Sequence, residues 1–216
     1  MNKVDYKKLY KDIYQPKTKP ELITVPPIQY VVVEGQGDPN TSEDYQEAIR
    51  LLYGLSYTIK MSKMTNQKIE GYFEYVVPPL EGFWWSQGET NVNYEHKENF
   101  EWISLIRQPE FVTEEVFAWA CEEVQKKKGL ECKRAKFREI EEGLCVQMLH
   151  VGSYDDEPQT IAKMEQYIKE NGLKSDIGNI ENGFVRRHHE IYLSDPRRTK
   201  MENLKTVIRI PMKEEK

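Results

Sequence analysis

Acidic, basic and aromatic side chains alternate near the carboxyl end of the sequence, over residues 184–193. If this stretch forms a strand, its side chains alternate between two faces, so that His188, Glu190 and Tyr192 share one face. A carboxylate beside a phenol can pair with a cationic ligand, or it can act as a general base whose pKa burial has raised. From the spacing alone, the simpler interpretation of Glu190 is a solvated strand residue paired with Arg186 or His188.

Aromatic side chains supply the flat surface that an aromatic ligand needs, and the chain has 4 Trp, 13 Tyr and 7 Phe. Trp84 and Trp85 are adjacent, so in an extended chain they point in opposite directions, one toward a ligand site and the other into the core. The sequence does not decide which indole does which. Glu81 is a second candidate carboxylate, although an exposed turn acid fits its neighbours equally well. The remaining candidate ligand contacts are Tyr45, Tyr53, Tyr154 and His188.

Motifs for other chemistries are absent from the sequence. His188 and His189 are neighbours that diverge on a strand, and His96 and His150 lie in unrelated segments, so we expect no metal site. The sequence contains no G-x-S-x-G elbow, phosphate-binding glycine loop or HExxH helix, and we expect no cofactor. Its three cysteines form no CxxC pair and encode neither a disulfide framework nor a zinc knuckle.

Composition narrows the class of partner. The 216 residues carry a net charge of -5 with both signs interspersed, which argues against a nucleic-acid partner. No stretch approaches the roughly 20 apolar residues of a membrane span, and residues 1–5 lack the apolar core of a signal peptide. We therefore expect a cytoplasmic protein without a nucleic-acid or membrane partner, and we expect it to be a monomer; its aromatic content suits a hydrophobic, aromatic small-molecule ligand.

The predicted elements follow the order strand–helix–strand–strand twice, which indicates an α+β fold. Both sets end on similar sequences, ISLIRQP at 103–109 and KTVIRIP at 205–211. A helix over 113–128 joins the two sets, and a short strand over 135–140 leads into the second. In the first set, strands cover 28–34, 71–77 and 100–107 around a helix capped at Thr41 or Ser42 that runs to about 63; in the second, strands cover 144–152, 184–193 and 204–212 around a helix from about 155 to 171.

Three segments resemble a known family. Residues 190–196 (EIYLSDP) and 204–211 (LKTVIRIP) are similar to the closing signature of GyrI-like domains, and residues 78–85 (PPLEGFWW) resemble the stand-alone bacterial branch of that family. The resemblance covers about residues 28–212. It implies two SHS2 modules in a pseudo-two-fold arrangement around a central ligand cleft, as in GyrI-like and SOUL-like folds. The implied single domain spans 26–212, with repeats at about 26–110 and 131–212, after an N-terminal extension over 1–25.

The resemblance also implies a range of functions. The family binds hydrophobic, often cationic or polyaromatic compounds, and some stand-alone members hydrolyse the cyclopropane of DNA-alkylating natural products. Glu190 falls at the position where related domains place their pocket carboxylate, so it is the expected base, with Tyr192 polarising the carbonyl of the ligand. Three functions stay open: xenobiotic detoxification by a cofactor-independent hydrolase, multidrug binding without chemistry, and interaction with a topoisomerase.

Overall fold

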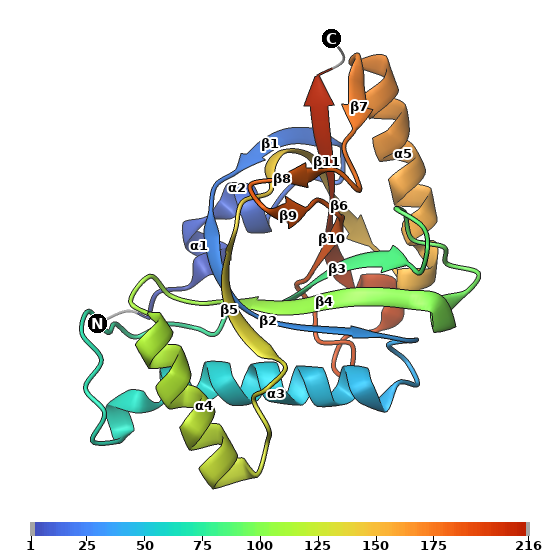
Figure 1. Ribbon diagram of the computed structural model, residues 1–216. Coiled ribbons are helices and arrows are strands. Elements are labelled where there is room, and N and C mark those ends of the chain that lie inside the picture. Colours follow the sequence, from blue (N-terminus) through green and yellow to red (C-terminus); the bar gives the residue numbers. More distant parts are fainter. Residues whose placement is uncertain (1–2, 215–216) are drawn as a thin grey trace.

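The computed structural model describes residues 3–214 and contains one large antiparallel sheet (Figure 1). Its order is β1-β6-β11-β10-β3-β4-β2-β5, and β7 pairs with the end of β11. A separate hairpin is formed by β8 and β9. The strands are β1 (Glu21–Val25), β2 (Ile28–Gln36), β3 (Leu80–Ser86), β4 (Phe100–Arg107), β5 (Ala135–Ile140), β6 (Gly143–Val151), β7 (Leu173–Ser175), β8 (Ile180–Glu181), β9 (Phe184–Val185), β10 (His188–Tyr192) and β11 (Lys205–Glu214).

The helices α3 (Glu43–Lys60) and α4 (Glu114–Lys128) begin where the sequence supplies capping groups. α3 follows Ser42, whose hydroxyl accepts a hydrogen bond of 3.3 Å from the backbone N–H of Tyr45. α4 follows Thr113 and ends at Gly129, which has the left-handed φ of 67° that closes many helices. Within residues 3–214, no helix combines the length and the apolar character needed to cross a membrane. The other helices are α1 (Tyr6–Leu9), α2 (Lys11–Tyr14) and α5 (Glu157–Glu170), with 3-10 turns η1 (Ser62–Met64), η2 (Lys97–Asn99), η3 (Tyr154–Asp156) and η4 (Met201–Asn203).

The strand order reads alike from both ends of the sheet. In the second half β6, β11 and β10 follow one another as β2, β4 and β3 do in the first, and β10 pairs with β3 at the centre. The two edge strands are exchanged between the halves. β1 comes first in the chain but pairs with β6 of the second half, and β5 comes just before the second half but pairs with β2 of the first. The α+β class expected from the sequence is confirmed. A two-fold rotation that relates the halves in space stays a prediction.

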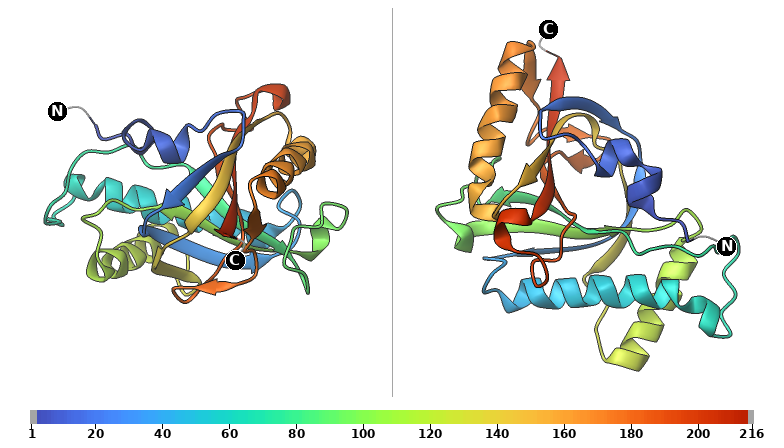
Figure 2. Two further views of the ribbon diagram at one scale, coloured as in Figure 1. Left: turned by 90° about the horizontal axis from the view of Figure 1, so that it is seen from above. Right: turned by 180° about the vertical axis from the view of Figure 1, so that it is seen from behind.

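Each half of the sheet has its own helix. α3 packs along β2 and β4, and α5 packs along β6 and β7 (Figure 1). The two further views show these helices over different halves of the sheet (Figure 2). At the centre, the register pairs Gly82 with Glu190 and Phe83 with His189. We call the side that bears Glu190 the helix face, because the first residues of α3 and α5 lie against it, and the side that bears His189 the opposite face.

The strand expected over 71–77 is wrong, because in the described chain these residues are not part of the sheet. The strand of this region is β3, which starts only after the prolines at 78–79. Proline lacks the N–H that a central strand must donate, so pairing begins beyond it. The aromatic residues before the prolines pack instead around Phe111, with ring centroids 5.2, 5.2 and 5.9 Å away for Tyr72, Phe73 and Tyr75.

The single strand expected over 184–193 is also wrong, because it is broken between β9 and β10. At the break, Arg186 turns its guanidinium into the interior, where Nη2 donates to two backbone carbonyl oxygens at 2.7 and 2.5 Å. Phe184 consequently packs on Phe83 of the opposite face, with ring centroids 4.9 Å apart. The prediction that alternate residues lie on the same face as Glu190 is therefore correct within β10 but wrong for Phe184, which precedes it.

Residues 1–25, to which the sequence assigns no structure, contain α1, α2 and β1 in their described part. Tyr6, Ile13 and Tyr14 are buried, and β1 extends the large sheet by pairing with β6. The hydroxyl of Tyr14 reaches Glu81 on the opposite face at 3.4 Å. This segment therefore helps to enclose the opposite face of the central strands.

Candidate functional site

Three side chains of β10 meet on the helix face, as the alternation of a strand predicts. The Nε2 atom of His188 lies 3.0 Å from Oε1 of Glu190, and the hydroxyl of Tyr192 donates a hydrogen bond of 2.7 Å to Oε2 of the same carboxylate. His188 and Glu190 are buried, with 3% and 7% exposure. Glu190 does pair with His188, but it is not the solvated residue that the spacing alone favours.

Trp84 extends these contacts from β3. Its Nε1 donates a hydrogen bond of 2.8 Å to the hydroxyl of Tyr192, so the single hydroxyl proton of Tyr192 is directed to Glu190. Tyr45, in the first turn of α3, packs its ring against Trp84 with centroids 5.7 Å apart. Gly82 leaves the space that the indole occupies, because a Cβ there would lie 2.5 Å from Nε1 of Trp84. The local sequence thus fixes the indole that orients Tyr192.

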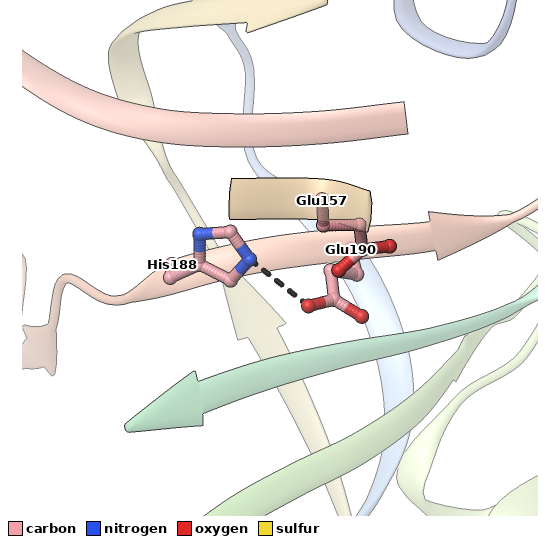
Figure 3. Close-up of side chains that lie close together, drawn as sticks. All are labelled: Glu157, His188 and Glu190. Atoms are coloured by element: carbon pink, nitrogen blue, oxygen red, sulfur yellow. Dashed lines mark hydrogen bonds and ion pairs between the residues drawn. The ribbon is translucent and has the colours of Figure 1, made fainter. Parts of the chain in front are cut away.

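A second carboxylate reaches this place from the start of α5. Glu157 is 1% exposed, and Glu157, His188 and Glu190 offer polar atoms that all lie within 4.8 Å of one another (Figure 3). Oε1 of Glu157 has no hydrogen-bond partner among the described residues. Burial, and then the negative charge of Glu190, raise the pKa of Glu157 well above its ordinary value of 4.5. We call Glu157, His188, Glu190 and Tyr192 the Glu190 cluster.

Glu190 shifts in the other direction, which corrects the expectation that burial raises its pKa. Burial alone would raise it, but the hydrogen bond and attraction of His188, together with the hydrogen bond from Tyr192, lower the pKa of Glu190 below 4.5. The pKa values of the two carboxyl groups are therefore shifted in opposite directions, so that the site favours the neutral form of Glu157 and the ionised form of Glu190. Neighbouring groups whose pKa values are pushed apart are the arrangement by which active sites keep an acid beside a base.

Half-buried tyrosines surround the two carboxylates. Tyr154, in η3, sets its ring edge against Tyr192 with centroids 5.8 Å apart. Burial, with the charges of Glu157 and Glu190, raises the pKa of Tyr154 to about 12. Tyr94 lies in the connection between β3 and β4, and its buried hydroxyl has no hydrogen-bond partner within residues 3–214. A bound ligand with polar groups could satisfy this hydroxyl and the free oxygen of Glu157.

Three residues predicted from the sequence lie elsewhere. Glu81 is buried rather than exposed, and it lies on the opposite face, where its Oε2 is 3.1 Å from Nε2 of His189. Trp85 also lies on that side and lines a cavity of about 550 Å³. Tyr53 lies on α3 with 36% exposure. Of the two adjacent indoles, Trp84 joins the Glu190 cluster and Trp85 does not.

The Glu190 cluster has the donor atoms that a divalent cation requires. The two adjacent histidines diverge as the sequence indicates, but Glu157 adds a donor that the sequence did not reveal. With His188 and Glu190 it forms a carboxylate–imidazole–carboxylate set, which is a donor type that divalent metals accept. A cation bound there would require Glu157 to lose its proton. The expectation of a metal-free site stays a prediction.

Glu157 and Tyr94 are the residues of this site that sequence reasoning missed. Glu157 ends an acidic run at 155–157 just before Pro158, which is typical of a helix start and gives no sign that one of the three acids is buried. Tyr94 lies in a long connection without periodicity. Only the packing of α5 and of this connection near β10 brings the two side chains to Glu190.

Solved structures of proteins from Listeria innocua are similar to this chain at 46–48% identity. An uncharacterized conserved protein from Listeria innocua is 48% identical, and the match covers 98% of this chain and 100% of that chain with a TM-score of 0.90. A hydrolase from Listeria innocua is 46% identical, with coverage of 98% and 100% and a TM-score of 0.87. The C-terminal domain of EcmrR, 12% identical over 91% of this chain and 98% of its own, shares the fold with a TM-score of 0.53.

A family model for the GyrI-like small molecule binding domain matches residues 18–213. A search of curated proteins found no match. The family match includes both halves of the sheet and every residue of the Glu190 cluster. The resemblance noted in the sequence is thereby confirmed, and the chain belongs to the family of GyrI-like small molecule binding domains.

Proposed function

We propose that the Glu190 cluster binds a flat, hydrophobic aromatic molecule and adds water to a strained ring of that molecule without a cofactor. The proposed substrates are cyclopropane-bearing natural products that alkylate DNA, and the proposed role is their detoxification. The observation that carries the proposal is the pair of buried carboxylates, Glu157 and Glu190, that lie together beside His188, with pKa values shifted in opposite directions. A general acid and a general base are thus available together in the protonation states that the reaction requires.

The reaction begins when the ionised Glu190 takes a proton from a water molecule while the water oxygen forms a bond to a cyclopropane carbon. The ring bond at that carbon breaks, and its electron pair moves into the conjugated carbonyl of the substrate. The carbonyl oxygen takes the proton of Glu157. Proton transfer from Glu190 to Glu157 then restores the starting state, and the net change is the addition of one water.

Tyr192 holds the base in place in this mechanism. Its hydroxyl accepts from Trp84 and donates to Glu190, so its proton is engaged with the carboxylate and not directed at a substrate. The donor role expected of Tyr192 from the sequence therefore passes to Glu157. Tyr192 acts as a positioning residue that also lowers the pKa of Glu190.

Aromatic side chains and solved relatives support the proposal. The rings of Trp84, Tyr94 and Tyr154 lie near the two carboxylates, and an aromatic pair contributes about 0.5–1.5 kcal/mol beyond the area it buries. Two similar solved structures are described as hydrolases, which favours chemistry over binding alone. The family match supports a small-molecule ligand in general.

The test is incubation of the protein with a cyclopropane-bearing DNA alkylator, followed by mass spectrometry of the small molecule. We expect the wild type to yield the water adduct. Glu190→Gln keeps the shape and polarity of the side chain but cannot accept a proton from water, so turnover should fall by about 10²–10⁴-fold while binding is largely retained. Glu202→Gln, at an exposed glutamate of η4, is the matched control and should behave as the wild type.

Two other results would point to different functions. If the wild type forms no adduct, and Glu190→Gln weakens binding of cationic ligands while sparing neutral ligands of the same shape, then the cluster sequesters cations and performs no hydrolysis. If Glu190→Gln changes neither binding nor turnover in an active protein, then the site lies elsewhere. Interaction with a topoisomerase stays a prediction that these measurements do not address.

A further inference from the structure

A cavity of about 550 Å³ lies on the opposite face of the central strands. Residues of β2, β3 and β4 form one wall, and the end of the β8–β9 hairpin forms another. Neither Glu157 nor Glu190 is among the residues that line it. Ligand pockets in proteins commonly measure about 300–1,000 Å³, so this cavity has room for a small molecule of its own.

A cation stacked on an indole forms the centre of this cavity. The guanidinium carbon of Arg187 lies 4.4 Å from the centroid of the Trp85 ring, and the indole N–H of Trp85 donates to Glu101. No carboxylate among residues 3–214 lies within the 4.0 Å of an ion pair with Arg187. Burial lowers the pKa of Arg187, and the charge of Glu101 only partly offsets this effect. Arg187 is thus a half-buried cation over the ring of Trp85, and the side-chain donors of Arg187 have no partner in the described chain.

Two of the three acidic side chains that line the cavity, Glu34 and Asp44, already have cations of their own. Glu34 has two basic partners, Lys136 and Arg138, at N···O distances of 3.0 and 3.1 Å. Asp44 accepts hydrogen bonds of 2.5 and 3.0 Å from the two terminal nitrogens of Arg134. These carboxylates are therefore not available to Arg187. The third carboxylate that lines the cavity, Glu101, accepts from the indole of Trp85 and forms no ion pair with Arg187, so within residues 3–214 Arg187 keeps free donors beside aromatic surface.

We propose that this cavity is a second small-molecule site, and that it takes a flat aromatic compound that bears a carboxylate. A guanidinium offers two parallel N–H groups that match the two oxygens of a carboxylate. The aromatic part of the compound packs against Phe184, which lines the cavity beside Trp85. The negative charge of the ligand supplies the partner that Arg187 lacks.

The test compares two probes of the same shape by isothermal titration calorimetry on the full chain, 1-naphthoate and the uncharged 1-naphthamide. We expect naphthoate to bind at least about tenfold more tightly, because only the carboxylate forms charge-assisted hydrogen bonds with Arg187. Arg187→Gln should reduce the affinity for naphthoate to that for naphthamide and leave the affinity for naphthamide unchanged. Arg198→Gln, at an exposed arginine, is the matched control and should keep the wild-type preference.

Several outcomes would overturn the proposal. These are the absence of naphthoate binding, equal affinity of the wild type for the two probes, and a preference for naphthoate that persists in Arg187→Gln. If Arg187→Gln misfolds and binds neither probe, Arg187→Lys takes its place, because lysine keeps the charge but lacks the two parallel N–H groups of the guanidinium. Arg187→Lys should bind naphthoate with intermediate affinity. Wild-type affinity of Arg187→Lys for naphthoate would count against the proposal. Glu190→Gln should leave naphthoate binding unchanged, so this site and the proposed hydrolysis fail separately.

Discussion

The β3–β10 pair carries a buried histidine with two carboxylates on each of its faces. The helix face has the Glu190 cluster, in which Glu157 and Glu190 lie beside His188. On the opposite face, His189 lies between two carboxylates, with N···O distances of 3.1 Å to Glu81 and 3.0 Å to Glu142. Both sets are buried in the same part of the molecule, and the two histidines are consecutive residues. Their chemistry nevertheless differs.

On the opposite face, the negative charges are matched by positive ones. Nη1 of Arg209 lies 2.6 Å from Oε1 of Glu142, and its Nη2 donates to the carbonyl oxygen of Ile13 at 3.1 Å. Burial alone would raise the pKa of Glu142, but the charges of His189 and Arg209 lower it to about 2. Burial alone would lower the pKa of His189, but Glu142 and then Glu81 raise it. Two carboxylates thus face an arginine and a histidine whose pKa is raised there.

The helix face has two carboxylates and one histidine. The unmatched carboxylate, Glu157, has a pKa raised well above 4.5, and one of its oxygens has no partner among the described residues. A buried carboxylate whose charge is matched by a cation keeps that charge and serves the structure. A buried carboxylate without a matching cation favours its protonated form, and that proton is available for transfer. The comparison therefore teaches that the unmatched acid, rather than burial or charge alone, distinguishes a candidate site from a structural network.

The largest effect is expected from breaking the matched set. Glu142→Gln would leave Arg209 and His189 buried without their shared anion, and removal of one partner from a buried ion pair costs about 3–5 kcal/mol in the free energy of unfolding. Urea denaturation at neutral pH measures this loss. The matched variant is Glu157→Gln, which replaces a neutral acid by a neutral amide of similar size and should not destabilise the protein. Equal losses in the two variants would contradict the contrast between the faces.

The pH dependence of stability sharpens the same contrast. Above the ordinary pKa of 4.5, Glu157 keeps a proton in the folded protein that it releases on unfolding, so its contribution is present below about pH 4.5 and is lost as the pH rises toward the folded pKa. Glu157→Gln lacks this loss. We therefore expect the variant to gain stability relative to the wild type between about pH 4.5 and pH 7.

Glu142 should give the opposite sign. Its folded pKa of about 2 lies below 4.5, so its contribution is present above about pH 4.5 and is lost as the pH falls toward 2. Urea denaturation of the wild type and of Glu157→Gln at a series of pH values separates the pH range above 4.5, where the contribution of Glu157 changes, from the range below 4.5, where that of Glu142 changes. A constant difference between the two proteins across pH 4.5 to 7 would mean that Glu157 is ionised in the folded state.

Local pattern was enough to predict much of the fold and part of the site. The alternation in β10 placed His188, Glu190 and Tyr192 on one face, because a strand repeats every two residues whatever it packs against. The strand predicted over 71–77 failed because the aromatic residues there have a high propensity for strands but pack around Phe111 instead. Strand propensity is a property of the individual side chain, whereas the pairing of a segment with a sheet depends on the whole fold.

The rest of the site depends on contacts between segments far apart in the sequence. Glu157 lies more than 30 residues before Glu190 and looks like any acid at a helix start, so only the docking of α5 reveals its burial. Glu81 was compatible with an exposed turn, and its burial follows from the pairing of β3 with β10 and from Tyr14 of the N-terminal segment. The direction of the pKa of Glu190 likewise required knowledge of its hydrogen-bond partners, because burial and hydrogen bonding act in opposite directions.

The smallest effect is expected from Tyr192→Phe, which removes one hydrogen bond to Glu190 and leaves the indole N–H of Trp84 without its acceptor. A hydrogen bond to a charged group contributes about 1.5–3 kcal/mol, so turnover should fall by roughly 10–100-fold. The pKa of Glu190 should also rise, because one of the groups that lower it is gone. The acid limb of the pH–rate profile should then move to higher pH, since the base must be ionised to act.

Tyr154→Phe is the matched control: its ring edge contacts Tyr192, so any change in turnover should come without a shift of this limb. An unmoved acid limb in Tyr192→Phe, in a variant that still binds the alkylator, would mean that Glu190 is not the group whose ionisation the rate reports.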